Sequence, residues 1–326
     1  MKRTWSTKFL LIAVIALAMT IALAPCGPAA GFGGASAASG GISAGAQFSI
    51  TQTNKAEDGI PAGMRVFYAS HSLMWEVPAP LGEEVSAYGI KDHTLVGLQS
   101  LGFARTSQHW DLADAQNKAK QALKTGKVDD FIMSPMDMPD TGVDSFVALG
   151  LENNPKMRFF LQNNWAGFNN DGQKARQFKM GPPWDSTTEE QLKTLNTECE
   201  NAFEAQAKKI NEKYGHPVIF IIPTSQANHT LRAMIIRKEF PGLDKQSQLF
   251  LDQIGHPTAP LVALNVYLHF ATIYGRSPVG LPMPSILKRT NNPKWDENFN
   301  KALQELAWKT VIEYPYSGVQ VPVSVK

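Results

Sequence analysis

The chain has 326 residues, a formal net charge of +2 at pH 7 and two cysteines. Basic and acidic residues are mixed along its length, so the sequence gives no indication of a nucleic-acid-binding surface. Cys26 lies in an N-terminal segment that we expect to be removed, so Cys199 is alone, and without a disulfide a hydrophobic core must hold the fold.

The first 37 residues have the features of a signal peptide. A positively charged start precedes an apolar run at residues 9–24, and residues 35–37 read Ala-Ser-Ala, a small-residue cleavage pattern. The apolar run is too short and wrongly flanked for a membrane span. We expect cleavage after residue 37 and a secreted or periplasmic protein without a stable membrane span. Lipid anchoring through Cys26 is the less favoured alternative, because Pro25 stands where lipoprotein signals have a small residue.

A leader rich in Gly, Ser and Ala follows at residues 38–59, and residues 60–326 are expected to form one domain. Five short runs in this domain are nearly continuous in apolar character, which is the pattern of parallel strands covered on both faces. They are Met64–Ala69, His93–Gln99, Asp130–Ser134, Met157–Gln162 and Val218–Ile222.

Helical patterns lie between and after these runs. They cover Leu112–Lys124, Gly142–Leu151, Ser186–Tyr214, Ala227–Phe240, Pro260–Tyr274 and Trp295–Glu313, with Asp140 as a plausible N-cap and Ser186 and Glu189 at capping-box spacing. Strands that alternate with helices predict an α/β fold, specifically a three-layer α/β/α sandwich with a five-stranded parallel sheet of flavodoxin-like order.

Ligands of such sheets bind beyond the carboxyl ends of the strands. The segments that follow the five predicted strands are rich in hydroxyls, amides and small residues. They are Ser70-His71-Ser72, Ser100-Leu101-Gly102, Pro135-Met136-Asp137, Asn163-Asn164-Trp165 and Pro223-Thr224-Ser225. The sequence therefore predicts a polar site at this edge of the sheet.

Ser72 is a candidate nucleophile, because it lies at a turn just beyond the first strand. The alternative is an N-cap serine, which is common at such turns. His256 is the candidate base, with Asp252 four residues earlier and Gly255 and Pro257 forcing an irregular loop. That loop can bring the carboxylate to the imidazole. The alternative is a turn-capping Asp252 beside a structural histidine. The chain order Ser, Asp, His is that of many hydrolytic triads.

Other residues carry open alternatives. His109 and Trp110 could line a substrate cleft, or could form the entry of the following helix with Asp111 as its cap. Asp137 and Asp140 could bind a hydroxyl-rich ligand, and capping is the better interpretation for Asp140. No metal-ligand pattern, glycine-rich phosphate loop or dinucleotide fingerprint occurs, so the sequence predicts neither a metal nor a cofactor.

The arrangement of these blocks resembles that of the SGNH (GDSL-like) hydrolases over roughly Arg65 to Leu281. Residues 108–111, 245–257 and 273–281 resemble a branch of uncharacterised exported bacterial members. The resemblance implies that Ser72 is the nucleophile, His256 the base and Asp252 its orienting group. It also implies that the backbone amides of Ser72 and Gly102 bind the oxyanion.

The sequence departs from the family pattern in three places. Ser70-His71-Ser72 stands where Gly-Asp-Ser is usual, and three residues instead of two separate Asp252 from His256. Met136 occupies the place of an oxyanion-binding asparagine, and Asn163 or Asn164 could replace that donor.

We therefore expect a serine hydrolase that cleaves an ester through an acyl-enzyme, with an O-acyl group on an extracellular carbohydrate as a candidate substrate. The alternative is an exported binding protein for a solute or glycan, or a catalytically inactive SGNH-like protein. Met136 favours the inactive version. One continuous succession of strands and helices disfavours a two-lobed solute-binding protein.

Overall fold

The structure is a computed structural model that describes residues 59–136, 138–165, 184–195 and 197–320. All of these residues belong to one compact unit. The predicted signal peptide and nearly all of the leader lie outside the described residues. Within the described part, no helix is long and apolar enough to cross a membrane.

The described chain contains one parallel sheet with the strand order β2-β1-β3-β4-β5. The strands are β1 (Arg65–Ser70), β2 (Thr94–Ser100), β3 (Asp130–Met133), β4 (Arg158–Gln162) and β5 (Ile219–Ile222). The predicted five-stranded parallel sheet of flavodoxin-like order is confirmed, and each predicted strand end lies within one residue of the observed one. Continuous apolar runs located the strands because both faces of the sheet are covered.

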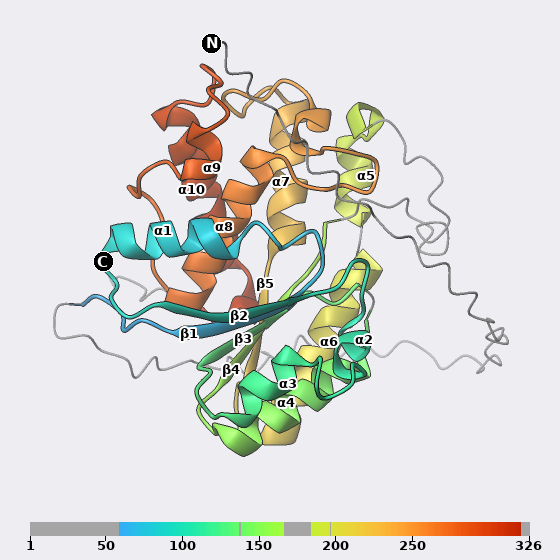
Figure 1. Ribbon diagram of the computed structural model, residues 1–326. Helices are drawn as coiled ribbons and strands as arrows, with labels where there is room; N and C mark the ends of the chain where they lie inside the picture. Colours follow the sequence, from blue (N-terminus) through green and yellow to red (C-terminus); the bar gives the residue numbers. More distant parts are fainter. Residues whose placement is uncertain (1–58, 137, 166–183, 196, 321–326) are drawn as a thin grey trace, which may run out of the picture. The chain divides into compact units, whose positions relative to one another are not determined.

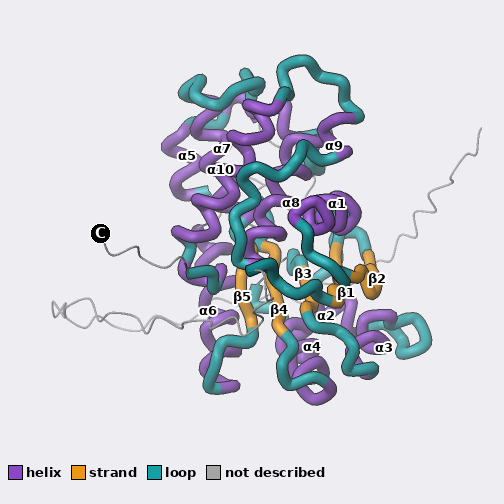
Figure 2. Tube along the Cα trace, turned by 90° about the vertical axis from the view of Figure 1, so that its left-hand side faces the viewer, coloured by secondary structure: helices purple, strands orange, loops and turns teal. Residues whose placement is uncertain are grey.

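Helices cover the two faces of the sheet (Figures 1 and 2), which confirms the three-layer prediction. One face carries α1 (Pro78–Tyr88), α7 (Thr224–Ile236), α8 (Ala259–Tyr274) and α10 (Glu297–Glu313), with α5 (Glu189–Thr194) and α9 (Ser285–Lys288) beside them. The other face carries α2 (Thr106–Trp110), α3 (Lys118–Lys124), α4 (Thr141–Asn153) and α6 (Thr197–Tyr214). Short 3-10 helices occur at η2 (Trp184–Ser186), η3 (Gln246–Leu249) and η4 (Pro315–Ser317).

Several predicted helix bounds were wrong for local reasons. The helix expected from Leu112 starts at Lys118, because the Asn117 side chain accepts a hydrogen bond from the Lys120 amide and caps α3 there. The predicted helix Ser186–Tyr214 is instead η2, α5 and α6. Its capping box is formed by Thr188 and Gln191. The helix expected at Ala227–Phe240 runs from Thr224 to Ile236.

Helix α1 was not among the predicted helical patterns. Pro78 is its first residue, where a missing amide proton costs nothing, and Gly89 ends it in the left-handed conformation with φ of +93°. Pro80 and Gly82 lie within its first turns and weaken the helical signal of the sequence.

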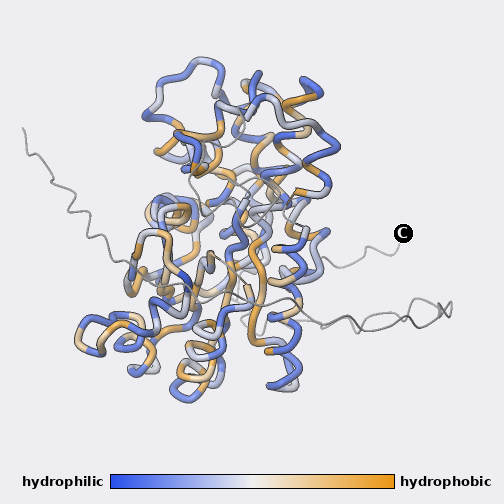
Figure 3. Tube along the Cα trace, turned by 90° about the vertical axis from the view of Figure 1, so that its right-hand side faces the viewer, coloured by the Kyte–Doolittle hydropathy of each residue, from blue (hydrophilic) through white to orange (hydrophobic). Residues whose placement is uncertain are grey.

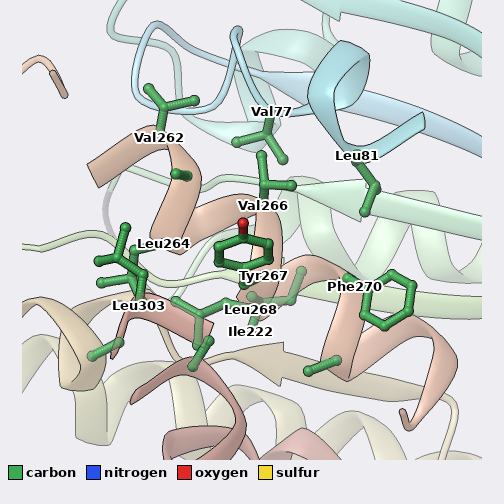
Figure 4. Close-up of a cluster of buried hydrophobic side chains, with 14 of the residues drawn as sticks. Val77, Leu81, Ile222, Val262, Leu264, Val266, Tyr267, Leu268, Phe270 and Leu303 are labelled. Atoms are coloured by element: carbon green, nitrogen blue, oxygen red, sulfur yellow. The ribbon is translucent and has the colours of Figure 1, made fainter. Parts of the chain in front are cut away.

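The two faces of the sheet bury separate cores. Val66 and Tyr68 of β1 pack into the core beneath α1, α7, α8 and α10, while Phe67 and Ala69 pack against α3, α4 and α6. The strands form a hydrophobic centre between more polar helices (Figure 3). Figure 4 shows part of the first core, where Val77, the residue before α1, and Leu81 of α1 lie near α8 side chains.

Helix α8 is the central element of the first core, because every residue from Pro260 to Tyr274 is buried. It begins three residues after His256 and ends at Tyr274, whose hydroxyl lies 2.6 Å from Nδ1 of His93, just before β2. The helix therefore runs antiparallel to the strands, from their carboxyl ends to their amino ends. Buried hydrogen bonds fix its register: His269 Nε2 donates to Gln162 Oε1 at 2.9 Å.

Glu84 is a carboxylate on the buried face of α1. Its residue is 1% exposed, and Oε2 has no hydrogen-bond partner among the described residues. Burial, with a smaller contribution from Glu83, raises the pKa of Glu84 to about 8. Folded protein therefore holds a proton at Glu84 at neutral pH, whereas the unfolded chain has lost it.

This burial predicts a specific pH dependence of stability. Between the ordinary pKa of a glutamate and about 8, the folded state binds the extra proton, so the free energy of unfolding falls as pH rises. Glu84→Gln removes this decrease, and its free energy of unfolding at pH 9 should exceed that of the parent by about 1–3 kcal/mol, because the parent then carries a buried ionised carboxylate whereas the amide is uncharged. Urea unfolding at pH 5, 7 and 9 measures it. Glu152→Gln, on an exposed position of α4, is the control. Parallel pH curves for parent and Glu84→Gln would contradict the prediction.

Candidate active site

The turn after β1 presents Ser72 at the carboxyl edge of the sheet. The Met74 amide donates to the His71 carbonyl, and Leu73 and Met74 are buried in the core, so the turn is anchored on its inner side. Ser72 is only half-buried. The N-cap of α1 is Val77, and Ser72 therefore does not cap that helix.

The loop from Phe250 to Pro257 holds the candidate base. Phe250 and Pro257 form an antiparallel bridge, and the Leu251 amide donates to the His256 carbonyl at 2.8 Å. Gly255 has a φ of +92°, which only glycine adopts without strain. This turn places the side chain of Asp252 back against His256, as the residue types of the loop predicted.

Asp252 organises the loop through both of its carboxylate oxygens. Oδ1 accepts the backbone amides of Ile254, Gly255 and His256 at 3.0, 3.0 and 3.2 Å. Oδ2 lies 2.5 Å from Nδ1 of His256. Partial burial raises the pKa of this carboxyl, but the hydrogen bonds from the side chain and backbone of His256 outweigh burial and hold it below its ordinary value. Asp252 is therefore a carboxylate at neutral pH.

His256 connects this carboxylate to Ser72. Its Nε2 lies 2.8 Å from Oγ of Ser72, although the two residues are 184 positions apart in the chain. Because the ionised carboxylate can only accept a hydrogen bond, Nδ1 carries the proton of the neutral ring and Nε2 accepts from the Ser72 hydroxyl. The three residues thus form the Asp–His–Ser relay geometry of a serine nucleophile with its base. The His256 side chain is 26% exposed, so a substrate can reach the relay.

Gly102 occupies the matching position after the neighbouring strand. Ser70 pairs with Ser100 in the parallel register of β1 and β2, so Ser72 and Gly102 each stand two residues beyond the same rung. Gly102 is exposed, and its missing side chain leaves open space. Ser72 and Gly102 both lie in loops. Within the described part of the chain, neither backbone amide donates a hydrogen bond to a backbone carbonyl. Both are therefore able to bind an external acceptor.

The two asparagines after β4 are engaged in structural hydrogen bonds. Asn163 donates to Gln226 Oε1 and accepts the Ser225 amide, which ties β4 to α7. Asn164 accepts from the Ser134 hydroxyl and donates to the Pro135 carbonyl. Met136, in the place of the family asparagine, is half-buried.

His109 and Trp110 do not contact the relay. His109 is buried with Nδ1 3.2 Å from Gln99 Nε2, and burial lowers its pKa to about 4. The Trp110 ring packs edge-on against Phe146 with centroids 5.1 Å apart, and Lys120 lies over it. His109 and Trp110 are the last two residues of α2, Asp111 follows as its C-cap, and Asn117 caps the next helix. The helix-entry interpretation with Asp111 as the cap was therefore wrong.

Asp137 lies outside the described residues. Asp140 caps α4 through the Gly142 amide, as expected. It also accepts the amides of Thr106 and Ser107 at the start of α2. One carboxylate therefore holds the amino ends of two helices, which is a favourable place for a negative charge. No group of three or more His, Cys, Asp or Glu side chains among the described residues is arranged to hold a metal ion.

Two residues near the relay, Ser134 and Trp165, were not among the candidate site residues chosen from the sequence. Ser134 contacts His71 through its hydroxyl, 2.9 Å from Nε2, and Trp165 donates from Nε1 to the Gly255 carbonyl at 2.9 Å. Their positions just after β3 and β4 were the available signal. Their partners come from distant segments, and only the tertiary structure identifies them.

The chain was compared with known proteins. No family model matches it, and no curated protein matches it. A solved structure that matches is that of a DUF4886 family protein from Bacteroides uniformis, which is 13% identical with a TM-score of 0.49. The alignment covers 80% of this chain and 98% of that one. No family assignment follows at this level of similarity.

The hydrogen bonds assign opposite tautomers to two histidines. His256 should carry its proton on Nδ1, facing Asp252, whereas His71 should carry it on Nε2, because the Leu73 amide donates to its Nδ1. Burial lowers the pKa of His71 to about 3, so His71 should stay neutral at pH 5. Long-range ¹H–¹⁵N correlation spectra of histidine-labelled protein at pH 5 and 8 test this, with His71→Asn and His256→Gln as assignment controls. An Nε2–H form of His256 at pH 8 would contradict the relay.

Proposed function

We propose that this protein is a serine hydrolase that cleaves an ester through a covalent acyl-enzyme. The observation that carries the proposal is the continuous relay from Asp252 through His256 to the Ser72 hydroxyl. The open position of Gly102 beside Ser72 supports it, because a carbonyl oxygen could receive both backbone amides there. The layout of these residues agrees with the resemblance to SGNH hydrolases.

In the first half of the reaction, Ser72 Oγ forms a bond to the ester carbonyl carbon while its proton moves to His256 Nε2. The carbonyl electron pair moves onto the oxygen, where the amides of Ser72 and Gly102 stabilise the negative charge. The carbon–oxygen bond to the alcohol then breaks, and His256 returns its proton to the leaving oxygen.

In the second half, water takes the place of the alcohol. His256 accepts a proton from the water as its oxygen bonds to the acyl carbon, and the bond to Ser72 Oγ then breaks with return of that proton to the serine. Asp252 stays ionised throughout, because its hydrogen bonds hold its pKa below the ordinary value. It keeps the ring in the Nδ1–H tautomer and stabilises the imidazolium that forms twice in each cycle.

The first test is hydrolysis of p-nitrophenyl acetate. Ser72→Ala and His256→Ala should lower kcat/KM by at least about 10³-fold, because they remove the nucleophile and its base. Asp252→Asn should lower it by about 10²- to 10⁴-fold, because the asparagine can stabilise the wrong tautomer.

Ser86→Ala is the matched control, since Ser86 is exposed on α1. A fluorophosphonate probe should in addition label Ser72, as identified by peptide mass spectrometry. Equal rates in the parent and Ser72→Ala, with both proteins folded, would refute the hydrolase. Such a result would favour the binding-protein alternative, which the donor-free side chain of Met136 also favours, and glycan binding would then be measured.

Two large exposed apolar side chains lie close in the chain to the relay residues. Trp75 lies three residues after Ser72 and is 46% exposed, and Leu251, directly before Asp252, is 71% exposed. Large exposed apolar groups beside a reactive centre are typical of substrate-binding surfaces. We propose that they contact the ester. A carbohydrate as its alcohol part, and a location outside the cytoplasm, depend on the predicted signal peptide.

Trp75→Ala should therefore act on substrate binding. We expect KM for p-nitrophenyl acetate and butyrate to rise by about 3- to 30-fold, with kcat changed less, because the loss of a stacking contact removes about 1–2 kcal/mol of binding energy. Initial-rate kinetics measure the two constants. Leu95→Ala is the control, since Leu95 is equally exposed but lies at the start of β2, away from the carboxyl edge. An unchanged KM would exclude Trp75 from the substrate site.

A further inference from the structure

The segment after β4 is connected by hydrogen bonds both to the turn that carries Ser72 and to the loop that carries Asp252 and His256. Asn164 accepts the Ser134 hydroxyl at 3.2 Å, and Ser134 Oγ accepts from Nε2 of His71 at 2.9 Å. His71 in turn accepts the Leu73 amide on Nδ1 at 3.3 Å. This line of buried hydrogen bonds runs from the end of β4, past the end of β3, to the two residues on either side of Ser72.

Trp165, the next residue in the chain, contacts the loop that carries Asp252 and His256. The Trp165 indole is fully buried, and its Nε1 donates to the Gly255 carbonyl at 2.9 Å. The amide of the same Gly255 donates to Oδ1 of Asp252, which holds His256. From outside the loop, Trp184 Nε1 also donates to the Asp252 carbonyl at 3.2 Å. The hydrogen bonds between Leu251 and His256 and within Asp252–His256 are internal to the loop and cannot fix its distance from Ser72.

The end of β4 is itself a fixed point. Asn163 accepts the Ser225 amide at the start of α7, and the Thr224 hydroxyl donates to the Asn163 carbonyl. Asn163, Asn164 and Trp165 are all at least nine-tenths buried. Three consecutive residues therefore connect one strand end to a helix, to the nucleophile turn and to the base loop.

We propose that Asn164 and Trp165 are positioning residues that set the distance between Ser72 and His256. Asn164 acts through Ser134 and His71, and Trp165 acts through Gly255. The proposal rests on the hydrolase function proposed above. The 2.8 Å contact between Ser72 Oγ and His256 Nε2 joins two loops that no strand pairing connects. A displacement of about 1 Å at such a contact can lower the rate by about 10²-fold.

The experiment removes one hydrogen bond at a time. Trp165→Phe keeps a buried ring but removes the donor to Gly255. His71→Asn keeps an acceptor for the Leu73 amide but loses the link to Ser134, whereas His71→Gln keeps a donor for Ser134. We expect kcat for p-nitrophenyl acetate to fall about 10- to 100-fold in Trp165→Phe, Ser134→Ala and His71→Asn, with KM within about twofold, and His71→Gln to recover part of kcat.

Ser317→Ala is the matched control. Ser317 is as buried as Ser134, and its hydroxyl donates to the Val311 carbonyl in the C-terminal region. Ser317→Ala should lower the thermal unfolding temperature by about as much as Ser134→Ala does, and should leave kcat unchanged. A fall in kcat for Ser317→Ala equal to that for Ser134→Ala would overturn the proposal, since any lost buried hydroxyl would then act alike.

A second readout does not depend on turnover. The ¹⁵N shift of His256 Nε2 reports its hydrogen bond to Ser72 and should move in Trp165→Phe and His71→Asn toward the value in Ser72→Ala. If the parent hydrolyses the ester and the variants show the same kcat and the same Nε2 shift as the parent, the positioning proposal is overturned and the hydrolase function stands. If the parent does not hydrolyse esters, the proposed function fails, and an unchanged Nε2 shift in these variants would then overturn the positioning as well.

Discussion

Parallel pairing of β1 with β2 on one side and β3 on the other places the candidate site residues at one edge of the sheet. Parallel strands end at the same side of a sheet, so Ser72, Gly102 and Ser134 leave neighbouring strands within a short distance of each other. The base loop reaches the same edge from the far end of the chain, because α8 follows it and runs back along the sheet to Tyr274. The sheet order thus determines which residues can meet.

Burial separates the histidines of this domain into two kinds. His71, His109 and His269 are each at most 2% exposed, and burial lowers their pKa values to about 3, 4 and 3, so they act as neutral hydrogen-bonding groups. His256 lies in a surface loop against an ionised carboxylate. Burial therefore keeps the three interior histidines neutral, whereas His256 faces both solvent and a carboxylate.

Carboxylates organise backbone amides twice in this structure. Asp140 accepts three amides and joins the starts of α2 and α4, where the Gly142 position leaves no room for a side chain against the Ser107 backbone. Asp252 accepts three amides of its own loop and still faces His256 with its other oxygen. The same residue type gives a helix cap in one place and an oriented base in the other, because only the second lies beside an imidazole.

The sequence by itself determined the strands, the alternation with helices and the candidate residues Ser72, Asp252 and His256. Continuous apolar runs and loop residues such as Gly255 and Pro257 are local signals, and the strands and the loop that they predict depend mainly on local energetics. Helix α1 and the divided region before α6 were missed, since Pro80 and Gly82 weaken the helical pattern and the side-chain caps at Asn117 and Thr188 compete closely with other candidates.

The tertiary structure alone decided which candidates meet. Asn163, His109 and Trp110 have structural partners, while Asn164, Ser134 and Trp165 contact the turn and the loop of the candidate relay. Hydrogen bonds between segments 30 to 90 residues apart depend on packing that no local pattern contains.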